Sequence, residues 1–349
     1  MKNRFSPLKI REKILKNRVV VPPMASQTAL SNGEVSEMTL NHYQRLAEAS
    51  PGLLIVEYSY VQFSGKSEEN QLAIDHDDKI SGLKKLAIRI QDGGALAGIQ
   101  LTHAGGKTHS HLTGGILLGP SDVAVPVKAE ILEKPQMMSL EKINEMKLWY
   151  LNAARRAVAA GFDLIEIHAA HGYGLNQWLS PITNKRQDLY GGDLRARARL
   201  LLEIIDLIRK NFSNILLSVR MPGQDFFEGG LKTEDAIAIA ILLEQAGVDV
   251  LHISSGIGGW RRPLDRQGEG YLVNEAKKIA EYVKIPVIGV GGIQTAAYID
   301  AALSDGAFSL AAIGRAILSD PAKWRKSQMM CSTSFAGSEQ EIVQRRDCN

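Results

Sequence analysis

The sequence has 349 residues, 45% of them hydrophobic, which is enough to fill the core of one large domain or two ordinary ones. The 41 Lys and Arg residues balance 38 Asp and Glu residues and are scattered along the chain, so we expect no nucleic-acid partner. The two cysteines, Cys331 and Cys348, are too few for a disulfide framework, and no apolar run approaches the ~20 residues of a membrane helix. These features predict a cytoplasmic protein without a membrane partner.

Short apolar and β-branched runs alternate with amphipathic stretches, and each run predicts a β-strand. The eight runs are residues 18–24, 52–58, 96–103, 162–169, 215–221, 248–255, 286–292 and 308–314. Eight alternating units predict a (β/α)8 TIM barrel over residues 1–349 as a single domain, with its core at 18–325 and a C-terminal tail at 326–349. A doubly wound open sheet is the competing fold, but no G-x-G-x-x-G follows the first strand.

Two predicted connections are longer than the few residues that usually join a strand to a helix. Residues 104–139 follow the third strand and are rich in Gly and Pro, and residues 172–192 follow the fourth. Both leave the C-terminal ends of strands, where barrel enzymes have their active sites. We therefore expect these extended loops to contribute to function.

The fourth strand ends in an unusual cluster, EIHAAHGY, which carries two imidazoles and a phenol. Strand alternation places Phe162, Leu164, Glu166 and His168 on one face, and that face is predicted to point into the barrel. His171 and Tyr173 follow where the chain turns. A single His at a strand end is more often a hydrogen-bonded structural residue, but the cluster favours a functional site.

Other predicted strands also end in polar groups, namely Glu57, Gln100, His103 and Arg220. Burying an Arg is costly unless it meets an anion or a polar ligand. Pairing of Arg220 with Glu57 or Asp225 is the purely structural alternative.

The seventh and eighth strands end in Gly291-Gly292 and Gly314-Arg315. Small residues let backbone N–H groups approach a phosphate, and Arg adds a fixed charge. Barrel phosphate sites are common at these two loops. The strand ends together predict a site for a phosphorylated, planar, hydrogen-bonding cofactor.

With these residues the chain resembles the Old Yellow Enzyme family of FMN-dependent ene reductases, in particular its bacterial branch with a His/His pair. The resemblance covers roughly residues 5–325, and KNRVVVPPM, IQLTHAGGK and IGRAIL match the first, third and eighth strand motifs. The most specific part is HAAHGY…SPITNKRQDLYGG. It matches the family at His168, His171, Tyr173, Pro181, Asn184, Arg186, Asp188, Tyr190, Gly191 and Gly192.

The resemblance implies non-covalently bound FMN, with NADPH or NADH as the reductant. Gln100 would bond the flavin pyrimidine edge, and Arg220 would lie near N1. The phosphate would be held by Gly291, Gly292, Gly314 and Arg315. The remaining residues implied beside the flavin are Pro23, Met24, Ala25 and Tyr58.

The resemblance also implies the chemistry. His168 and His171 would donate hydrogen bonds to the carbonyl oxygen of an enone or enal. Tyr173 would protonate the α carbon after hydride transfer from flavin N5 to the β carbon. The small-molecule substrate would be the main partner, and a homo-oligomer is compatible with the sequence.

The chain departs from the family pattern near the flavin. Related bacterial enzymes often have Cys and Tyr at the positions of Ala25 and Gln27, and a small residue at the position of Tyr58. These departures keep open a flavin-binding barrel that has lost ene reduction or acts on another redox substrate. A more distant alternative is a metal-dependent barrel hydrolase, with ligands from His103, Glu166, His168 and His171 and none from the first strand.

Overall fold

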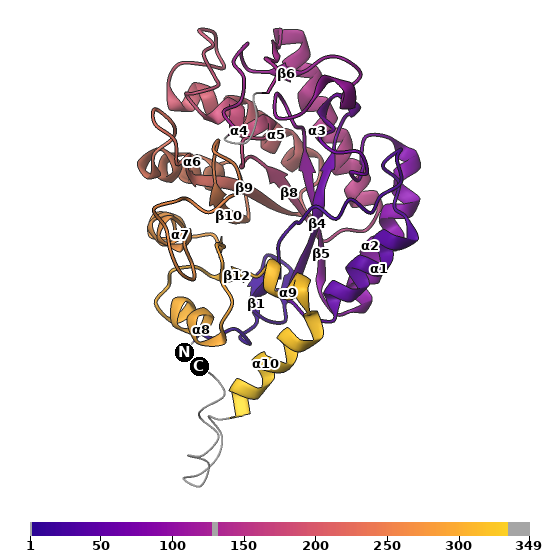
Figure 1. Cartoon of the computed structure of the whole chain (residues 1–349), viewed down its shortest axis with the longest axis vertical. Coiled ribbons are helices and arrows are strands. Elements are labelled where there is room, and N and C mark those ends of the chain that lie inside the picture. Colours follow the sequence, from indigo (N-terminus) through magenta and orange to yellow (C-terminus); the bar gives the residue numbers. More distant parts are fainter. Residues whose placement is uncertain (1, 128–131, 334–349) are drawn as a thin grey trace.

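The computed structural model describes residues 2–127 and 132–333, and its centre is a closed barrel of eight parallel strands (Figure 1). In chain order these strands are β3 (Val19–Val21), β4 (Leu53–Tyr60), β5 (Leu96–Thr102), β8 (Leu164–His168), β9 (Leu216–Gln224), β10 (Val250–Ser255), β11 (Val287–Gly289) and β12 (Leu310–Ala312). Each lies within or overlaps one of the eight predicted runs. The barrel closes by pairing β12 with β3, so the prediction of a TIM barrel is confirmed and the open sheet is wrong.

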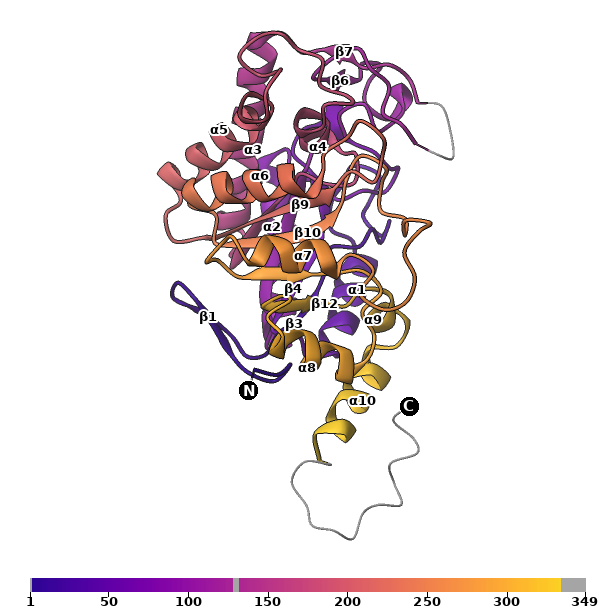
Figure 2. The same cartoon turned by 90° about the vertical axis from the view of Figure 1, so that its left-hand side faces the viewer.

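Helices follow the strands and cover the outside of the barrel (Figures 1 and 2). They are α1 (Glu37–Ala47), α2 (Ile80–Asp92), α3 (Leu140–Ala159), α4 (Gly174–Leu179), α5 (Leu194–Asn211), α6 (Thr233–Gln245), α7 (Val273–Ala280), α8 (Ala296–Ser304), α9 (Arg315–Ser319) and α10 (Pro321–Thr333). Ser36, Ser139 and Asp193 begin α1, α3 and α5 as N-caps, because each side chain accepts a backbone N–H of the first turn.

The core has two layers, as strand alternation requires. Inside the barrel, Val20, Leu53 and Leu164 belong to one apolar cluster near the strand beginnings. Between barrel and helices, Ile165 and Ile167 belong to a much larger cluster. The predicted inward direction of Leu164, Glu166 and His168 therefore agrees with the packing. Phe162 is an exception: it precedes β8 and packs with the outer cluster, so its predicted orientation is wrong.

An antiparallel hairpin of β1 (Leu8–Ile10) and β2 (Lys13–Leu15) precedes the barrel, and the sequence analysis does not predict it. Ile10 and Leu15 join the apolar cluster inside the barrel. The hairpin therefore covers the end where the strands begin, and it lies to the left of the strands in Figure 2. Its alternation is hard to recognise because only a few apolar residues stand among many charged ones.

The two predicted long loops are present. The loop after β5 contains the 3-10 helix η3 (Ser110–Leu112) and the short paired strands β6 (Leu118–Gly119) and β7 (Gln136–Met137). The loop after β8 contains α4. The connection after β4 contains the 3-10 helices η1 (Phe63–Gly65) and η2 (Asp77–Lys79). These connections surround the C-terminal ends of β4, β5 and β8.

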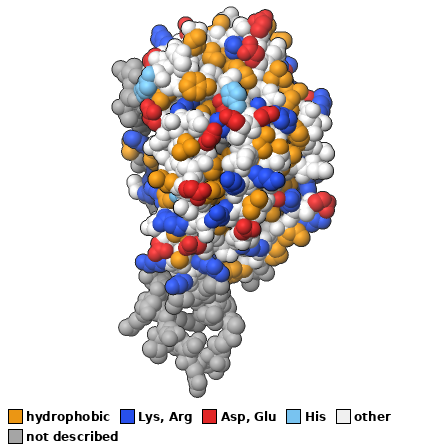
Figure 3. Space-filling view, turned by 90° about the vertical axis from the view of Figure 1, so that its right-hand side faces the viewer, with side chains coloured by type: hydrophobic (Ala, Val, Ile, Leu, Met, Phe, Trp, Pro, Cys, Tyr) orange, Lys and Arg blue, Asp and Glu red, His pale blue; other side chains and the backbone are white. Residues whose placement is uncertain are grey.

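Charged side chains of both signs are interspersed with apolar ones on the face that carries α1 and α2 (Figure 3). Among the described helices, none combines the length and the apolar character needed to cross a membrane. The predicted C-terminal tail begins within α10, and residues 334–349, including Cys348, lie outside the described part of the chain.

Candidate active site

The histidine pair, His168 and His171, lies at the end of β8 and in the turn that follows. His168 Nε2 and His171 Nδ1 face each other at 3.2 Å, and His171 Nε2 lies 2.6 Å from the Ser254 hydroxyl on β10. His171 has a left-handed backbone with φ 61°, which is uncommon for a residue with a side chain. Such backbones are concentrated at functional sites, where the surrounding structure holds them in place.

Both imidazoles are buried, with 2% of His168 and 6% of His171 exposed. Burial, followed by the positive charge of Arg220, holds the pKa of each ring well below its usual range. Both rings are therefore neutral near pH 7. His168 Nδ1 is buried and has no hydrogen-bond partner among the described residues. A neutral pair with an unsatisfied polar atom is suited to binding a polar ligand.

Tyr173 lies against the histidine pair. Its ring contacts the His168 ring edge to face, with centroids 5.0 Å apart, and the Tyr58 ring lies 5.4 Å away. The Lys107 ammonium is 4.6 Å from the centre of the Tyr173 ring and donates to the His171 carbonyl at 2.5 Å. Burial raises the pKa of Tyr173, and a hydrogen bond with Tyr58 opposes that shift. Tyr173 is therefore a protonated phenol at neutral pH.

Lys107 is a residue of this site that the sequence analysis missed. It stands in IQLTHAGGK, a segment identified only as a strand motif, and the long loop after β5 brings it over Tyr173. Ser254 was missed as well. The only signal for it is its place near the end of the sixth predicted strand.

A layer of polar side chains fills the barrel below the histidine pair. Glu166 accepts hydrogen bonds from Gln100 and Ser218 at 2.9 Å and lies 3.0 Å from His252 Nδ1. Burial alone would raise the pKa of Glu166, but His252 and Arg220 outweigh it and lower the pKa. The charge of this carboxylate is therefore held inside the barrel.

Arg220 stands next to this layer and is only 7% exposed. Burial lowers the pKa of its guanidinium to about 10, with Glu166 opposing the shift, so Arg220 is still charged at neutral pH. Its Nε has no hydrogen-bond partner among the described residues. A buried cation with an unpaired donor fits a group that carries negative charge or accepts hydrogen bonds.

Small residues lie at the ends of β11 and β12. Gly291 and Gly292 have φ of 122° and 69°, which favour glycine, and a Cβ on Gly292 would come within 2.9 Å of the Tyr271 ring. A Cβ on Gly314 would come within 3.2 Å of Met24 Sδ. These glycines form a cradle that side chains would fill.

The predicted cofactor residues of the first strand are next to this cradle. Pro23 is buried, Met24 is half-buried and Ala25 is exposed. Arg315 is exposed at the start of α9. The Arg262 guanidinium lies 4.9 Å from the centre of the Tyr271 ring, and neither residue was among those predicted. The long connection between β10 and α7 brings both to the cradle.

The contacts that the alternative interpretations require do not occur among the described residues. Glu57 accepts from the backbone and side chain of Ser26, and Asp225 accepts from Ser180, and no ion pair joins either carboxylate to Arg220 in the described part of the chain. Burial raises the pKa of Glu57 to about 7. His103 stacks on Trp149 of α3 outside the barrel, away from the histidine pair. The ligands suggested for a metal site therefore do not converge, and the described residues contain no group of three or more His, Cys, Asp or Glu arranged to hold a metal ion.

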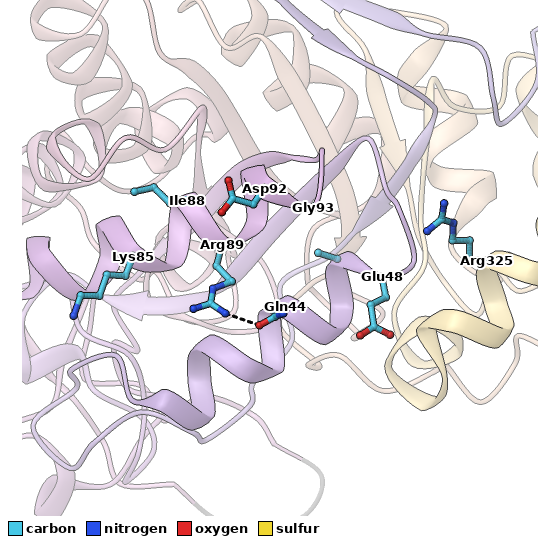
Figure 4. A pocket seen from close by; sticks show the side chains of 9 residues that line it. Gln44, Glu48, Lys85, Ile88, Arg89, Asp92, Gly93 and Arg325 are labelled. Carbon is cyan, nitrogen blue, oxygen red and sulfur yellow. Dashed lines mark hydrogen bonds between the residues drawn. The ribbon is translucent and has the colours of Figure 1, made fainter.

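A surface depression of about 620 Å³ lies elsewhere, between α1, α2 and Arg325 of α10 (Figure 4). Arg89 donates to Gln44 at 2.6 Å across it. It is formed by the C-terminal ends of α1 and α2, which lead back to the beginnings of strands. It is therefore on the opposite side of the barrel from the polar strand ends.

The profile of the family described as NADH:flavin oxidoreductase / NADH oxidase matches residues 3–331. A protein named NADH oxidase from Thermoanaerobacter brockii is 36% identical over 354 residues, which cover 99% of this chain and 53% of that protein. The chain thus spans about half the length of this relative.

Two solved structures with the same fold are also similar in sequence. A complex of 2-naphthoyl-CoA reductase with 2-naphthoyl-CoA has a TM-score of 0.88 and 26% identity, covering 95% of this chain and 52% of that one. Morphinone reductase in complex with tetrahydroNAD has a TM-score of 0.79 and 26% identity, covering 94% of this chain and 92% of that one.

Proposed function

Because the chain belongs to the NADH:flavin oxidoreductase / NADH oxidase family, the Old Yellow Enzyme family, we propose that it is an FMN-dependent NAD(P)H oxidoreductase that reduces the activated C=C bond of α,β-unsaturated carbonyl compounds. The observation that carries this proposal is the neutral histidine pair beside Tyr173. It places two ring nitrogens 3.2 Å apart, next to a protonated phenol. The pair supports our proposal that the chain belongs to the His/His branch.

The strand ends fit a phosphorylated flavin. Arg220 supplies a buried charge whose Nε has no partner among the residues that the structure describes, and the glycines at the ends of β11 and β12 leave the space that a phosphate needs. The residues proposed to contact the flavin are Pro23, Met24, Ala25, Tyr58, Gln100, Arg220, Gly291, Gly292, Gly314 and Arg315. When bound, FMN would supply the hydride for the β carbon, and NADH or NADPH would provide the electrons that reduce the flavin again.

The protein residues bind and polarise the substrate. His168 Nε2 and His171 Nδ1 donate to the carbonyl oxygen, where negative charge develops in the transition state. When the Ser254 hydroxyl donates to His171 Nε2, that ring carries its proton on Nδ1, which is the nitrogen that faces His168. Tyr173 then gives its phenolic proton to the α carbon. The 2-naphthoyl-CoA bound to one similar structure contains a conjugated carbonyl, which is consistent with this substrate class.

The test uses the purified protein. Heat release and chromatography should yield one FMN per chain, and anaerobic turnover of cyclohexenone should require NADH or NADPH. Adding 4-hydroxybenzaldehyde should produce a broad long-wavelength absorbance band as the phenolate binds the histidine pair over the flavin. A preparation with only FAD or metal, or with FMN but no enone turnover, contradicts the proposal.

A second candidate is an FMN barrel of the same family that passes electrons to another acceptor. Two observations favour it: Tyr58 crowds Tyr173 at 5.4 Å, and the relative from Thermoanaerobacter brockii is named NADH oxidase. With dioxygen as acceptor, NADH and a proton would yield NAD+ and hydrogen peroxide. A rate of hydrogen peroxide formation in air that is higher than the anaerobic rate of enone reduction would favour this candidate.

A further inference from the structure

Glu68, in the connection between β4 and α2, links two residues that approach the site from different strands. Its Oε1 accepts the Tyr58 hydroxyl at 2.5 Å, and its Oε2 accepts the Gln27 side-chain amide at 2.5 Å. Tyr58 is on β4 and only 8% exposed, whereas Gln27 follows β3 and is exposed. Glu68 is partly exposed, so it connects a buried phenol with solvent.

Tyr58 in turn contacts Tyr173. Their rings are tilted by 37° with centroids 5.4 Å apart, so the two phenols lie side by side. The Tyr173 ring also contacts His168 and the Lys107 ammonium. Tyr58 differs from these two neighbours because its hydroxyl donates to Glu68, a carboxylate that is partly exposed to solvent. Glu68, Tyr58 and Tyr173 therefore lie in series, joined by the hydrogen bond from Tyr58 to Glu68 and by the ring contact of Tyr58 with Tyr173.

The proposed reaction needs such a line. Each time Tyr173 gives its proton to carbon it becomes a phenolate, and it must regain a proton before the next turnover. A substrate bound at the histidine pair covers the Tyr173 side that faces the site. Tyr58, which is hydrogen-bonded to the partly exposed Glu68, offers a route for the returning proton through the protein.

We propose that Glu68 and Tyr58 form a relay that returns a proton from solvent to Tyr173 after each turnover, with Gln27 holding the Glu68 carboxylate in place. This inference rests on the proposed ene reduction. Solvent protonates the Glu68 carboxylate, the Glu68 carboxyl gives that proton to the Tyr58 oxygen, and the Tyr58 hydroxyl gives its own proton to the Tyr173 phenolate. One proton enters from water for each proton that Tyr173 delivers to carbon, and no electrons move in these steps.

The backbone of Gln27 supports a positioning role. Its φ of 53° lies in the left-handed region, which is uncommon for residues other than glycine. This conformation directs the amide to Glu68 Oε2. The second oxygen of Glu68 is thereby occupied, and the first is directed to Tyr58.

A kinetic experiment separates the relay from the acid itself. Tyr58→Phe and Glu68→Gln each interrupt the relay, and Tyr282→Phe and Glu69→Gln are matched controls at exposed positions. The two relay variants are mixed with cyclohexenone as pre-reduced, FMN-loaded enzyme. Their first-turnover rate should fall much less than their steady-state rate, because Tyr173 begins the first turnover protonated. Steady-state kcat per bound flavin should fall about tenfold or more, most strongly at high pH, while KM changes little. Imidazole or another small weak acid should restore kcat in these variants alone.

A second experiment needs no activity. In protein labelled with fluorotyrosine, the nine tyrosines give separate fluorine NMR signals, and the Tyr173 signal is the one lost in Tyr173→Phe. Glu68→Gln should shift the Tyr173 signal when Tyr58 is present and leave it unshifted in a Tyr58→Phe background. Glu69→Gln should shift it in neither background.

The outcomes distinguish the relay from the proposed function. Absence of enone turnover by the wild-type protein contradicts the proposed function. In that case the response of the Tyr173 NMR signal to Glu68→Gln still decides whether Glu68, Tyr58 and Tyr173 are connected. If the wild type turns over enone but the relay variants keep full steady-state kcat, or lose first turnover and steady state equally without rescue, the relay is wrong. A Tyr173 fluorine signal that does not shift in Glu68→Gln overturns the relay as well.

Discussion

The ends of β5 and β8 carry the same sequence signal and have different environments. Each apolar strand leads to a histidine, His103 after β5 and His168 at the end of β8. His103 accepts the Gly105 N–H at 3.0 Å on Nδ1, its Nε2 lies 3.3 Å from the Ser64 hydroxyl, and its ring stacks on Trp149. His168 keeps a buried nitrogen that has no hydrogen-bond partner in the described part of the chain.

At these two strand ends, the hydrogen bonds and the neighbouring rings of each histidine, and not its burial or residue type, separate the structural histidine from the candidate ligand-binding one. Both rings are buried and both have lowered pKa values. Only His168 faces a second imidazole and a phenol. The following predictions test this distinction.

The largest effect is expected at the histidine pair. His168→Ala or His171→Ala should lower enone reduction by about 10²–10³-fold, because an oxyanion donor is lost where charge develops. Stopped-flow kinetics should show that flavin reduction by NAD(P)H falls less, and titration with 4-hydroxybenzaldehyde should show that most of the long-wavelength band is gone. Variants that keep both the band and the rate would place the pair among structural histidines.

Tyr173→Phe should slow enone reduction by about 10²-fold, because the general acid is removed and the oxyanion donors stay. The phenol band should persist with nearly unchanged affinity. Rapid mixing of reduced enzyme with enone measures the rate, and spectral titration measures the affinity. Loss of both together would mean that Tyr173 supports the histidine pair and is not the proton donor.

Ser254→Ala should weaken phenolate binding by about tenfold, because one hydrogen bond to His171 Nε2 is lost and the ring is no longer held with its proton on Nδ1. Ser255→Ala is the matched control, since the Ser255 hydroxyl donates instead to the Gly259 carbonyl at 2.6 Å. The measurement is the Kd of 4-hydroxybenzaldehyde for each variant. Equal Kd values would remove Ser254 from the site.

The smallest effect on activity is expected at β5. His103→Gln should leave enone reduction within about twofold, because His103 lies outside the barrel, and its effect should appear in stability. Burial lowers the pKa of His103 from 6.5 to about 4, so the folded state favours the neutral ring. Its contribution is present above pH 6.5 and is lost as the pH falls towards 4.

Denaturant unfolding at several pH values measures this contribution. Over that interval the free energy of unfolding of the wild type should fall more steeply than that of His103→Gln, by up to about 1.4 kcal/mol per pH unit for one proton. His42, His168, His171 and His252 also have lowered pKa values and contribute to the slope that stays in the variant. Parallel curves would contradict the assigned burial of His103.

Much of the contrast between the two strand ends was present in the sequence. Gln100 points into the barrel, where it bonds Glu166, so alternation directs His103, three residues later, outwards. By the same rule His168 shares the inward face of Glu166. The eight strands, both long loops and the polar strand ends could be predicted because each depends on periodicity within a short segment. The N-terminal hairpin could not, because its few apolar residues are recognisable only against the barrel interior that they cover.

The sequence by itself determined the barrel, the family and the residue types at the strand ends, because local alternation and a dense motif are readable along one chain. Only the tertiary structure decided which polar atoms are satisfied. Ser254 meets His171, Lys107 covers Tyr173, and Glu68 joins Gln27 to Tyr58. These partners are far apart in sequence or come from irregular loops, and hydrogen bonds are specific over a few tenths of an ångström. No periodicity encodes contacts of that kind, so folding of the loops around the barrel decides them.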